Sequence, residues 1–136
     1  MTWPVLIALL FAVIAEKESH FDPAAWNRDE DSVGIVQIRR CVIDDINEAY
    51  GLDFSYADRW SPYRSRLIFA LCMALNAERY RKETGKEPDV EALVRMWNGG
   101  PDGYREPETL EYWRAVKPIF ERVRKQWQKG RGVCSR

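Results

Sequence analysis

The chain has 136 residues, which suffices for one domain with a substantial hydrophobic core. Hydrophobic residues make up 46% of the sequence and charged residues 31%, a balance that excludes a disordered or collagen-like chain. Lys and Arg together number 21, as do Asp and Glu, so the formal net charge is zero. A general nucleic-acid binder carries a net basic surface, and we therefore expect no nucleic-acid partner.

Cysteine and histidine are scarce. The single histidine, His20, and the cysteines Cys41, Cys72 and Cys134 do not match the spacing of a His/Cys metal cage, so we expect neither a metal nor a cofactor. Cys41 and Cys72 fall inside apolar helical patterns, which predicts buried thiols. Cys134 lies in a polar tail, where it could be reactive or pair with another chain.

The first segment, residues 3–15, is apolar throughout. It is shorter than the ~20 residues that a membrane-spanning helix needs. No Lys or Arg precedes it and no A-x-A cleavage site follows it, so it is a poor match to a secretory signal. We interpret it as a buried core helix and expect no membrane span and no signal peptide.

Proline, glycine and apolar spacing predict the remaining elements. Ser61 followed by Pro62 is typical of a helix start, and Gly51 and Gly85 are typical of helix ends. Pro118 is expected to kink or divide the last helix. In chain order we expect a helix from about Pro4 to Ser19, a polar loop over 22–32, a small strand or extended turn over 33–38, and helices over Val42–Tyr50, from Pro62 to about Thr84, from Pro88 to about Asn98, and from Pro107 onward. The fold class is therefore mainly α, a single helical domain with a small β element near residues 33–38.

The last residues, 122–136, form a basic helix end and tail. They contain six Lys or Arg residues and no acidic residue: Arg122, Arg124, Lys125, Lys129, Arg131 and Arg136. One interpretation is a solvated helix end whose cations complement the helix dipole. The alternative is an electrostatic contact with an anionic surface such as a cell-wall polymer.

Glu18 is the candidate for chemistry. It stands four residues after Ile14 and seven after Phe11, so it lies on the apolar stripe of the first helix, whereas Glu16 points elsewhere. Burial and the negative end of the helix dipole both favour a carboxyl group that stays protonated, as a general acid requires. The alternative is a structural glutamate that is hydrogen-bonded to a loop.

Four short motifs follow one another along the chain. They are residues 18–25 (ESHFDPAA), 34–38 (GIVQI), 96–100 (MWNGG) and 108–112 (ETLEY). In this order they resemble the E-S-x-F-[DN]-P-x-A, G-L-M-Q-I, A-Y-N-x-G and E-T-x-x-Y motifs of soluble lytic transglycosylases and goose-type lysozymes, and together they cover nearly the whole chain.

The resemblance implies that residues 1–121 form a lysozyme-like catalytic domain. Its substrate would be the β-1,4 bond between N-acetylmuramic acid and N-acetylglucosamine in peptidoglycan, with Glu18 as the catalytic acid/base. In lytic transglycosylases the 6-hydroxyl of the sugar completes the reaction and gives a 1,6-anhydro product, so one carboxylate suffices. In goose-type lysozymes, which are hydrolytic muramidases, water takes that role. A non-catalytic glycan-binding or structural domain is the third alternative.

The resemblance also implies substrate-binding roles around Glu18. Gln37 would bond an N-acetyl or hydroxyl group or brace a loop, and Gly34 would let the backbone approach the sugar or mark a turn. Ser19 would fix the end of the helix.

Later motifs supply further candidate ligands of the sugar. Trp97 and Asn98 would contact it, although Trp97 is equally typical of a core and Asn98 of a loop brace. Glu108 and Tyr112, four residues apart, would share a helical face that points into the groove.

The sequence departs from the family pattern at several positions. Trp97 replaces a Tyr, Val36 and Arg39 stand where Met is common, and Asn27 replaces a frequent Ser. These departures bear on sugar contacts and product rather than on Glu18. Residues 29–31 (DED) are the natural source of a second carboxylate if water is activated, and Trp26 and Tyr104 are further candidates for stacking on sugars.

The expected setting follows from the same resemblance. The enzyme would act as a monomer on the cell wall, in the periplasm or outside the cell. The small size without a separate wall-binding module would suit a phage lysis enzyme (an endolysin) or a virion-associated one.

Overall fold

The computed structural model describes the backbone of residues 1–134 and the side chains of residues 1–130. Within this range the chain is mainly helical and contains one small antiparallel sheet, as the sequence predicts. The helices are α1 (Trp3–Ser19), α2 (Arg40–Tyr50), α3 (Pro62–Thr84), α4 (Val90–Gly99) and α5 (Leu110–Cys134), joined by the short 3₁₀ helices η1 (Tyr56–Trp60), η2 (Gly103–Arg105) and η3 (Pro107–Thr109). No helix among residues 1–134 is long and apolar enough to cross a membrane.

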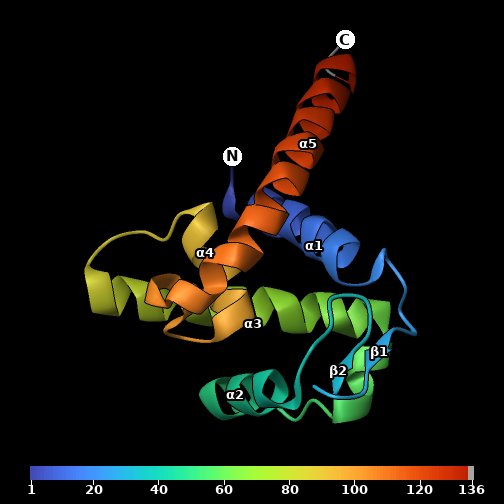
Figure 1. The fold of residues 1–136 in the computed structure, drawn as a ribbon, viewed down its shortest axis with the longest axis vertical. Coiled ribbons are helices and arrows are strands. Elements are labelled where there is room, and N and C mark those ends of the chain that lie inside the picture. The colour runs from blue at the N-terminus through green and yellow to red at the C-terminus, as the bar shows by residue number, and fades with distance from the viewer. Residues whose placement is uncertain (135–136) are drawn as a thin grey trace.

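Helix α3 runs through the middle of the molecule, with α2 on one side and α1, α4 and α5 on the other (Figure 1). Its residues Ile68, Phe69 and Met73 are completely buried. Leu10 and Ile14 of α1 are completely buried in the same cluster. The apolar first segment is therefore a core helix, as predicted.

The predicted limits of α2 and α3 are confirmed at both C-termini. Gly51 and Gly85 follow the last helical residues with φ angles of 64° and 72°, a left-handed conformation that favours glycine. At the start of α3 the hydroxyl of Ser61 accepts the backbone N–H of Arg64 at 3.2 Å, and Pro62 occupies the first turn.

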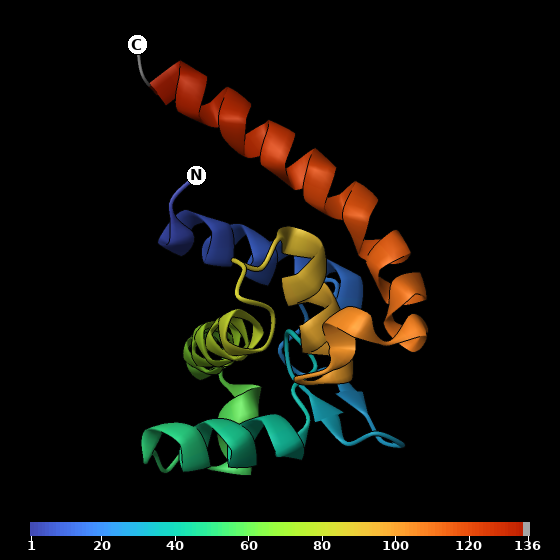
Figure 2. The same ribbon diagram turned by 90° about the vertical axis from the view of Figure 1, so that its left-hand side faces the viewer.

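One proline-based prediction needs correction, and of the two outcomes predicted at Pro118, a kink or a division, the division is absent. Helix α4 begins at Val90 rather than Pro88, because the Asp89 carboxylate caps it by accepting the Ala92 N–H at 2.8 Å. Pro118 does not divide α5, which continues through it to Cys134. Figure 2 shows the helix changing direction between its first turns and its long outer part.

The β element is shorter than expected and involves a second segment. Strand β1 (Trp26–Asn27) pairs with β2 (Ser32–Val33), with Trp26 opposite Val33. Residues 34–38 form a tight turn closed by a bridge between Val33 and Ile38. Strand β1 lies in the stretch predicted to be a loop, since a two-residue strand has no alternation to detect.

The two cysteines whose side chains are described differ in exposure. Cys72 is buried as predicted, and desolvation raises the pKa of its thiol to about 12. Cys41 is exposed, so that prediction was wrong. Cys41 is the second residue of α2, a helix that turns Ile43 and Ile46 toward the core. The Cys134 side chain lies outside the described residues.

Candidate active site

The end of α1 is fixed by Ser19. Its hydroxyl donates to the Ile35 carbonyl at 2.7 Å and accepts the N–H of Asp22 at 3.0 Å. His20 and Phe21 then adopt left-handed backbone angles, with φ of 52° and 65°, which turn the chain sharply away from the helix. Ser19 therefore joins the last turn of α1 to the 34–38 turn.

Glu18 is directly bonded to Tyr112. The Tyr112 hydroxyl, on α5, donates to Oε1 of the half-buried Glu18 at 2.8 Å, across 94 residues of sequence. Burial, the charge of Glu18 and this hydrogen bond raise the pKa of Tyr112 far above its ordinary value, so the phenol keeps its proton. No described residue donates to Oε2 of Glu18. One carboxyl oxygen is thus held by the protein, and the other can face a ligand.

A cleft of about 660 Å³ opens beside this pair. Five residues singled out by the sequence line it together, although they come from four separate segments: Glu18, Gln37, Trp97, Asn98 and Tyr112. A volume of this size lies within the range of small-molecule sites.

Gln37 both lines the cleft and braces a loop. Its amide nitrogen donates to the carbonyls of Ala25 at 3.1 Å and Gly34 at 2.9 Å. No described residue donates to the amide oxygen, which is therefore available as an acceptor in the cleft. Gln37 can therefore brace a loop and also bond a sugar group, the two roles considered for it.

Gly34 does not line the cleft. It has a φ of 86°, and a Cβ built there would lie 2.0 Å from the carbonyl oxygen of Arg59. Glycine is required because the turn packs against backbone. Its predicted role of letting the backbone approach a sugar has no support in this geometry, and the turn explains the residue.

The second side of the cleft is formed where α4 ends. The buried guanidinium of Arg95 donates to the Thr109 hydroxyl at 2.8 Å and the Glu106 carbonyl at 2.9 Å. These bonds hold the end of α4, with Trp97 and Asn98, against η3, the segment just before α5. The Trp97 ring packs edge-on against Phe69 with centroids 4.9 Å apart, so part of its surface belongs to the core.

Three other candidates lie away from the cleft lining. Glu108 is exposed on η3. Its spacing from Tyr112 assumed one helix, whereas α5 begins only at Leu110. Trp26 is exposed and its indole N–H donates to Asp31, and the Tyr104 ring packs against Tyr80.

Comparison with known proteins identifies the family. The family described as "Transglycosylase SLT domain" matches residues 5–120. This chain belongs to that family. It is 32% identical over 94 residues to Lysozyme 1 of Crassostrea virginica, covering 68% of this chain and 47% of that protein. It is also 40% identical over 45 residues to a lysozyme of Magallana gigas, covering 33% of each chain. The chain thus spans about half or less of the length of these relatives, and no solved structure matches it.

Two cations near Glu18 were not among the predicted ligands of this SLT domain. Lys17 and Arg39 both line the cleft. The Lys17 ammonium lies 5.5 Å from the centre of the Tyr112 ring, and the charge of Arg39 counteracts part of the rise in the pKa of Tyr112. The sequence signal was available, because Arg39 stands at a position where the family often has Met.

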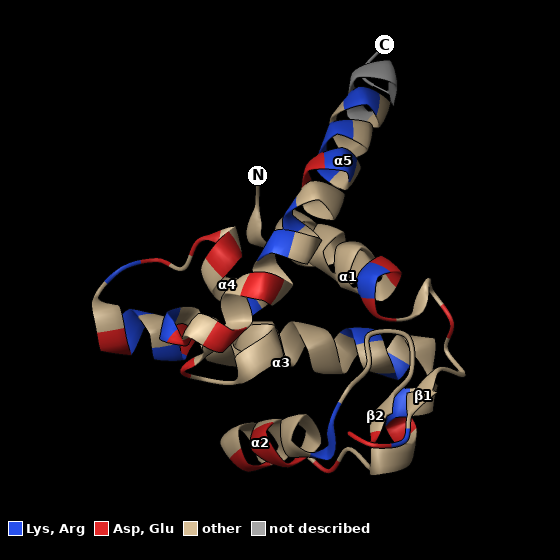
Figure 3. Cartoon of the chain, viewed as in Figure 1, with Lys and Arg blue, Asp and Glu red and all other residues tan. Residues whose placement is uncertain are grey.

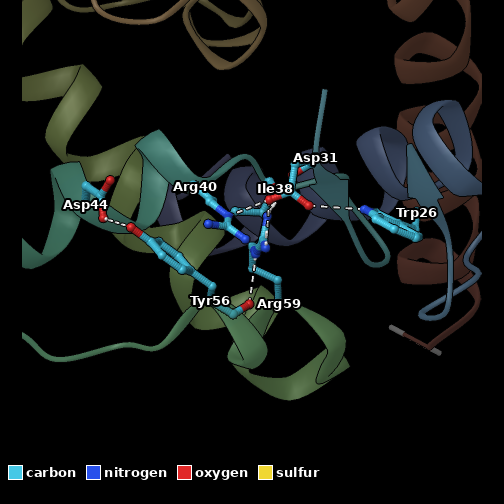
Figure 4. Close-up of polar contacts among 7 residues, drawn as sticks. All are labelled: Trp26, Asp31, Ile38, Arg40, Asp44, Tyr56 and Arg59. Atoms are coloured by element: carbon cyan, nitrogen blue, oxygen red, sulfur yellow. Dashed lines mark hydrogen bonds and ion pairs between the residues drawn. The ribbon is translucent and has the colours of Figure 1, made fainter. Parts of the chain in front are cut away.

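On the side of the cleft opposite α4, which we call the hairpin side, a buried arginine braces the hairpin of β1 and β2 and the 34–38 turn (Figure 4). Arg59 is 3% exposed and donates to the carbonyls of Tyr56 and Asp31 at 2.8 Å and of Ile38 at 3.0 Å. Hydrogen bonds from Trp26 and Arg40, then the charge of Arg59, hold the pKa of Asp31 below its ordinary value. Asp31 therefore supports the hairpin and is not a free carboxylate.

The acidic loop does bring one carboxylate to the cleft. Glu30 lines it, with an oxygen 4.0 Å from the Arg39 guanidinium and 3.4 Å from the Ser32 hydroxyl. Among the described residues, no group of three or more His, Cys, Asp or Glu side chains could hold a metal ion.

Proposed function

We propose that this SLT domain cleaves the β-1,4 bond between N-acetylmuramic acid and N-acetylglucosamine in peptidoglycan, with Glu18 as the acid/base and a 1,6-anhydro product. The observation that carries the proposal is the hydrogen bond between Tyr112 and Glu18 in the cleft. It joins the first and last motifs of the family at one carboxyl group. The other motifs contribute Gln37, Trp97 and Asn98 to the same cleft.

The first step is proton donation. Oε2 of Glu18 accepts no hydrogen bond from a described residue. It gives its proton to the glycosidic oxygen as the bond between that oxygen and C1 breaks. Tyr112 can donate to Oε1 throughout, because that oxygen is an acceptor in both the acid and the carboxylate. The bond strengthens as the carboxylate forms, since hydrogen bonds to ionised acceptors are stronger.

The second step returns the proton to Glu18. The 6-hydroxyl of the muramic acid attacks the positively polarised C1, and its proton passes to the Glu18 carboxylate. This route needs no second carboxylate, whereas most glycosidases use a pair. It fits an acidic loop in which Asp31 is bound to Arg40 and Arg59, and Glu30 contacts Arg39 and Ser32.

Hydrolysis is the second candidate. Glu30 lines the same cleft as Glu18 and could activate a water molecule, and the curated relatives are lysozymes by name. The two routes differ in their products. Transglycosylation leaves anhydromuramic acid ends, and hydrolysis leaves reducing ends.

The cations beside Glu18 favour an acidic glycan over a neutral one. Lys17 and Arg39 can bind a carboxylate on the lactyl group or peptide stem of muramic acid, which chitin-type oligosaccharides lack. We propose the cell wall as the site of action, in the periplasm or outside the cell. Monomeric action and a phage origin stay predictions.

Mass spectrometry of muropeptides after digestion of purified cell walls tests the proposal. Anhydromuramic ends are the expected result. Reducing ends would favour the lysozyme alternative, and a Glu30→Gln variant should then be inactive as well. Intact walls after prolonged incubation with folded protein would overturn the enzymatic proposal in both forms.

A further inference from the structure

The charge of this chain is divided unequally along its length. Residues 1–120 hold 15 Lys and Arg against 20 Asp and Glu, a net charge of −5. Residues 121–136 hold six Lys and Arg against one acidic residue, a net charge of +5. The boundary coincides with the end of the family match at residue 120. The zero net charge of the whole chain therefore conceals a basic appendage on an acidic domain.

This appendage is a helix that leaves the body of the molecule. Helix α5 continues to Cys134, and its outer part, residues 121–134, projects from the fold as a rod (Figure 1). We call residues 121–134 the α5 arm. Figure 3 shows Lys and Arg recurring along the arm, whereas acidic residues recur on α2.

The first turn of the arm is packed against the domain. Val123 packs against the hydrophobic core, so one face of this turn points inward. Arg122, Lys125 and Lys129 stand at positions i, i+3 and i+7 on another face, where all three are exposed. Together with Pro118, Glu121 and Gln126 they line a shallow hollow of about 440 Å³.

Two of these cations are available to a partner. Arg122 forms an ion pair with Glu16 of α1, which ties the base of the arm to the domain. No described carboxylate lies within ion-pair distance of Lys125 or Lys129. Neither lysine lines the cleft that holds Glu18.

We propose that the α5 arm is a second binding surface for the substrate polymer, which holds peptidoglycan through the carboxylates of its peptide stems. This inference rests on the proposed function, because that function places the domain on a polymer whose stems carry many carboxylates. The ammonium groups of Lys125 and Lys129, four residues apart on one face of a helix, match such a polyanion by charge. Its contribution depends on salt, since exposed charges are screened. The arm raises affinity for the insoluble wall without taking part in bond cleavage.

Co-sedimentation of the full chain with purified walls at 4 °C tests this inference. Lys125→Gln/Lys129→Gln should bind about tenfold more weakly than wild type near 0.15 M salt, and the difference should vanish near 1 M salt. Lys82→Gln/Lys86→Gln is the matched control, since it removes the same charge from exposed positions in the last turn of α3 and just after it. The control should bind like wild type.

Walls whose carboxyl groups have been converted to neutral amides identify the ligand. Wild type and Lys125→Gln/Lys129→Gln should bind amidated walls equally, because any binding lost at Lys17 and Arg39 of the cleft is lost by both proteins. Unchanged wild-type binding to amidated walls would overturn the assignment to stem carboxylates and point to phosphate polymers. Equal losses in the arm variant and its control would overturn a specific role of the arm.

Cleavage of soluble muropeptide oligomers separates this inference from the proposed function. The arm variant should cleave them at the wild-type rate, because neither lysine lines the cleft. An equal loss of soluble cleavage and wall binding would contradict the arm as a separate surface. A wild-type chain that binds walls through the arm but cleaves nothing would contradict the proposed function and support the arm.

Discussion

The two sides of the cleft are each organised by a buried arginine, but the arginines have different partners. On the hairpin side Arg59 binds three backbone carbonyls and reaches the Asp31 carboxylate at 3.4 Å. On the α4 side Arg95 binds one backbone carbonyl, the Thr109 hydroxyl and the Glu91 carboxylate.

The difference follows from the local backbone. The hairpin side has strands of only two residues, so little of its backbone is satisfied within the sheet, and Arg59 donates to the carbonyl of Asp31 and adds a second donor at that of Ile38. On the other side α4 is a regular helix, and Arg95 only ties its end to the segment before α5. Arg59 thus provides hydrogen bonds that a longer sheet would otherwise provide, whereas Arg95 links a regular helix to the segment before α5.

Loss of the acid should abolish activity while leaving both sides of the cleft intact. For Glu18→Gln we expect a fall in kcat of about 1,000-fold or more, because the amide cannot donate a proton to the leaving oxygen. The fold should persist, since Gln keeps an acceptor for Tyr112. Release of soluble fragments from walls measures the rate, and circular dichroism the fold. Glu16→Gln, two residues earlier, should stay active; near-normal turnover by folded Glu18→Gln would refute the assignment.

The two arginines should differ in their effect on stability. Arg59→Met should lower the free energy of unfolding by about 3 to 5 kcal/mol, because three carbonyls each lose a donor and only that of Ile38 keeps a second one outside η1, the Val33 N–H. Arg95→Met should cost about 2 to 3 kcal/mol, since Arg95 binds only one carbonyl, that of Glu106, which keeps the Thr109 backbone N–H. Urea denaturation measures both. Equal losses would remove the distinction between the two sides.

Tyr112→Phe tests the link between α5 and the acid. The substitution removes the hydroxyl group that donates to the Glu18 carboxylate as that carboxylate forms. We therefore expect kcat to fall about tenfold to hundredfold with little change in KM. Tyr104→Phe is the matched control, because Tyr104 does not line the cleft. A change in KM alone would show that Tyr112 binds sugar instead of supporting Glu18.

The smallest expected effect is on the pH dependence of stability, and it concerns only the hairpin side of the cleft. Because the pKa of Asp31 is lowered in the folded protein, its contribution to stability is present above its ordinary value of 3.8 and is lost as pH falls through the folded value. Wild type should therefore have a higher Tm than Asp31→Asn at pH 6, and the gap should close toward pH 3. A constant gap across this range would contradict the role of the Asp31 charge.

Local signals in the sequence predicted much of the helical framework. The cap at Ser61 and the glycines at positions 51 and 85 mark helix ends, which depend on neighbouring residues only. The family was also predictable, because its motifs keep their order along the chain. Exposure of Cys41 and the displacement of Glu108 were not predictable, since both depend on where a helix begins and which side it turns inward.

Sequence alone predicted the residues that we propose for the chemistry: Glu18 at the end of an apolar helix, followed by ordered motifs. Only the tertiary structure decided which of them meet. Tyr112 reaches Glu18 across 94 positions because α1 and α5 pack together, and Gly34 is withdrawn from the cleft because it packs on Arg59. The supporting arginines were invisible to sequence reasoning for the same reason. The partners of Arg59 are mostly backbone carbonyls, which every residue has, and only folding selects among them.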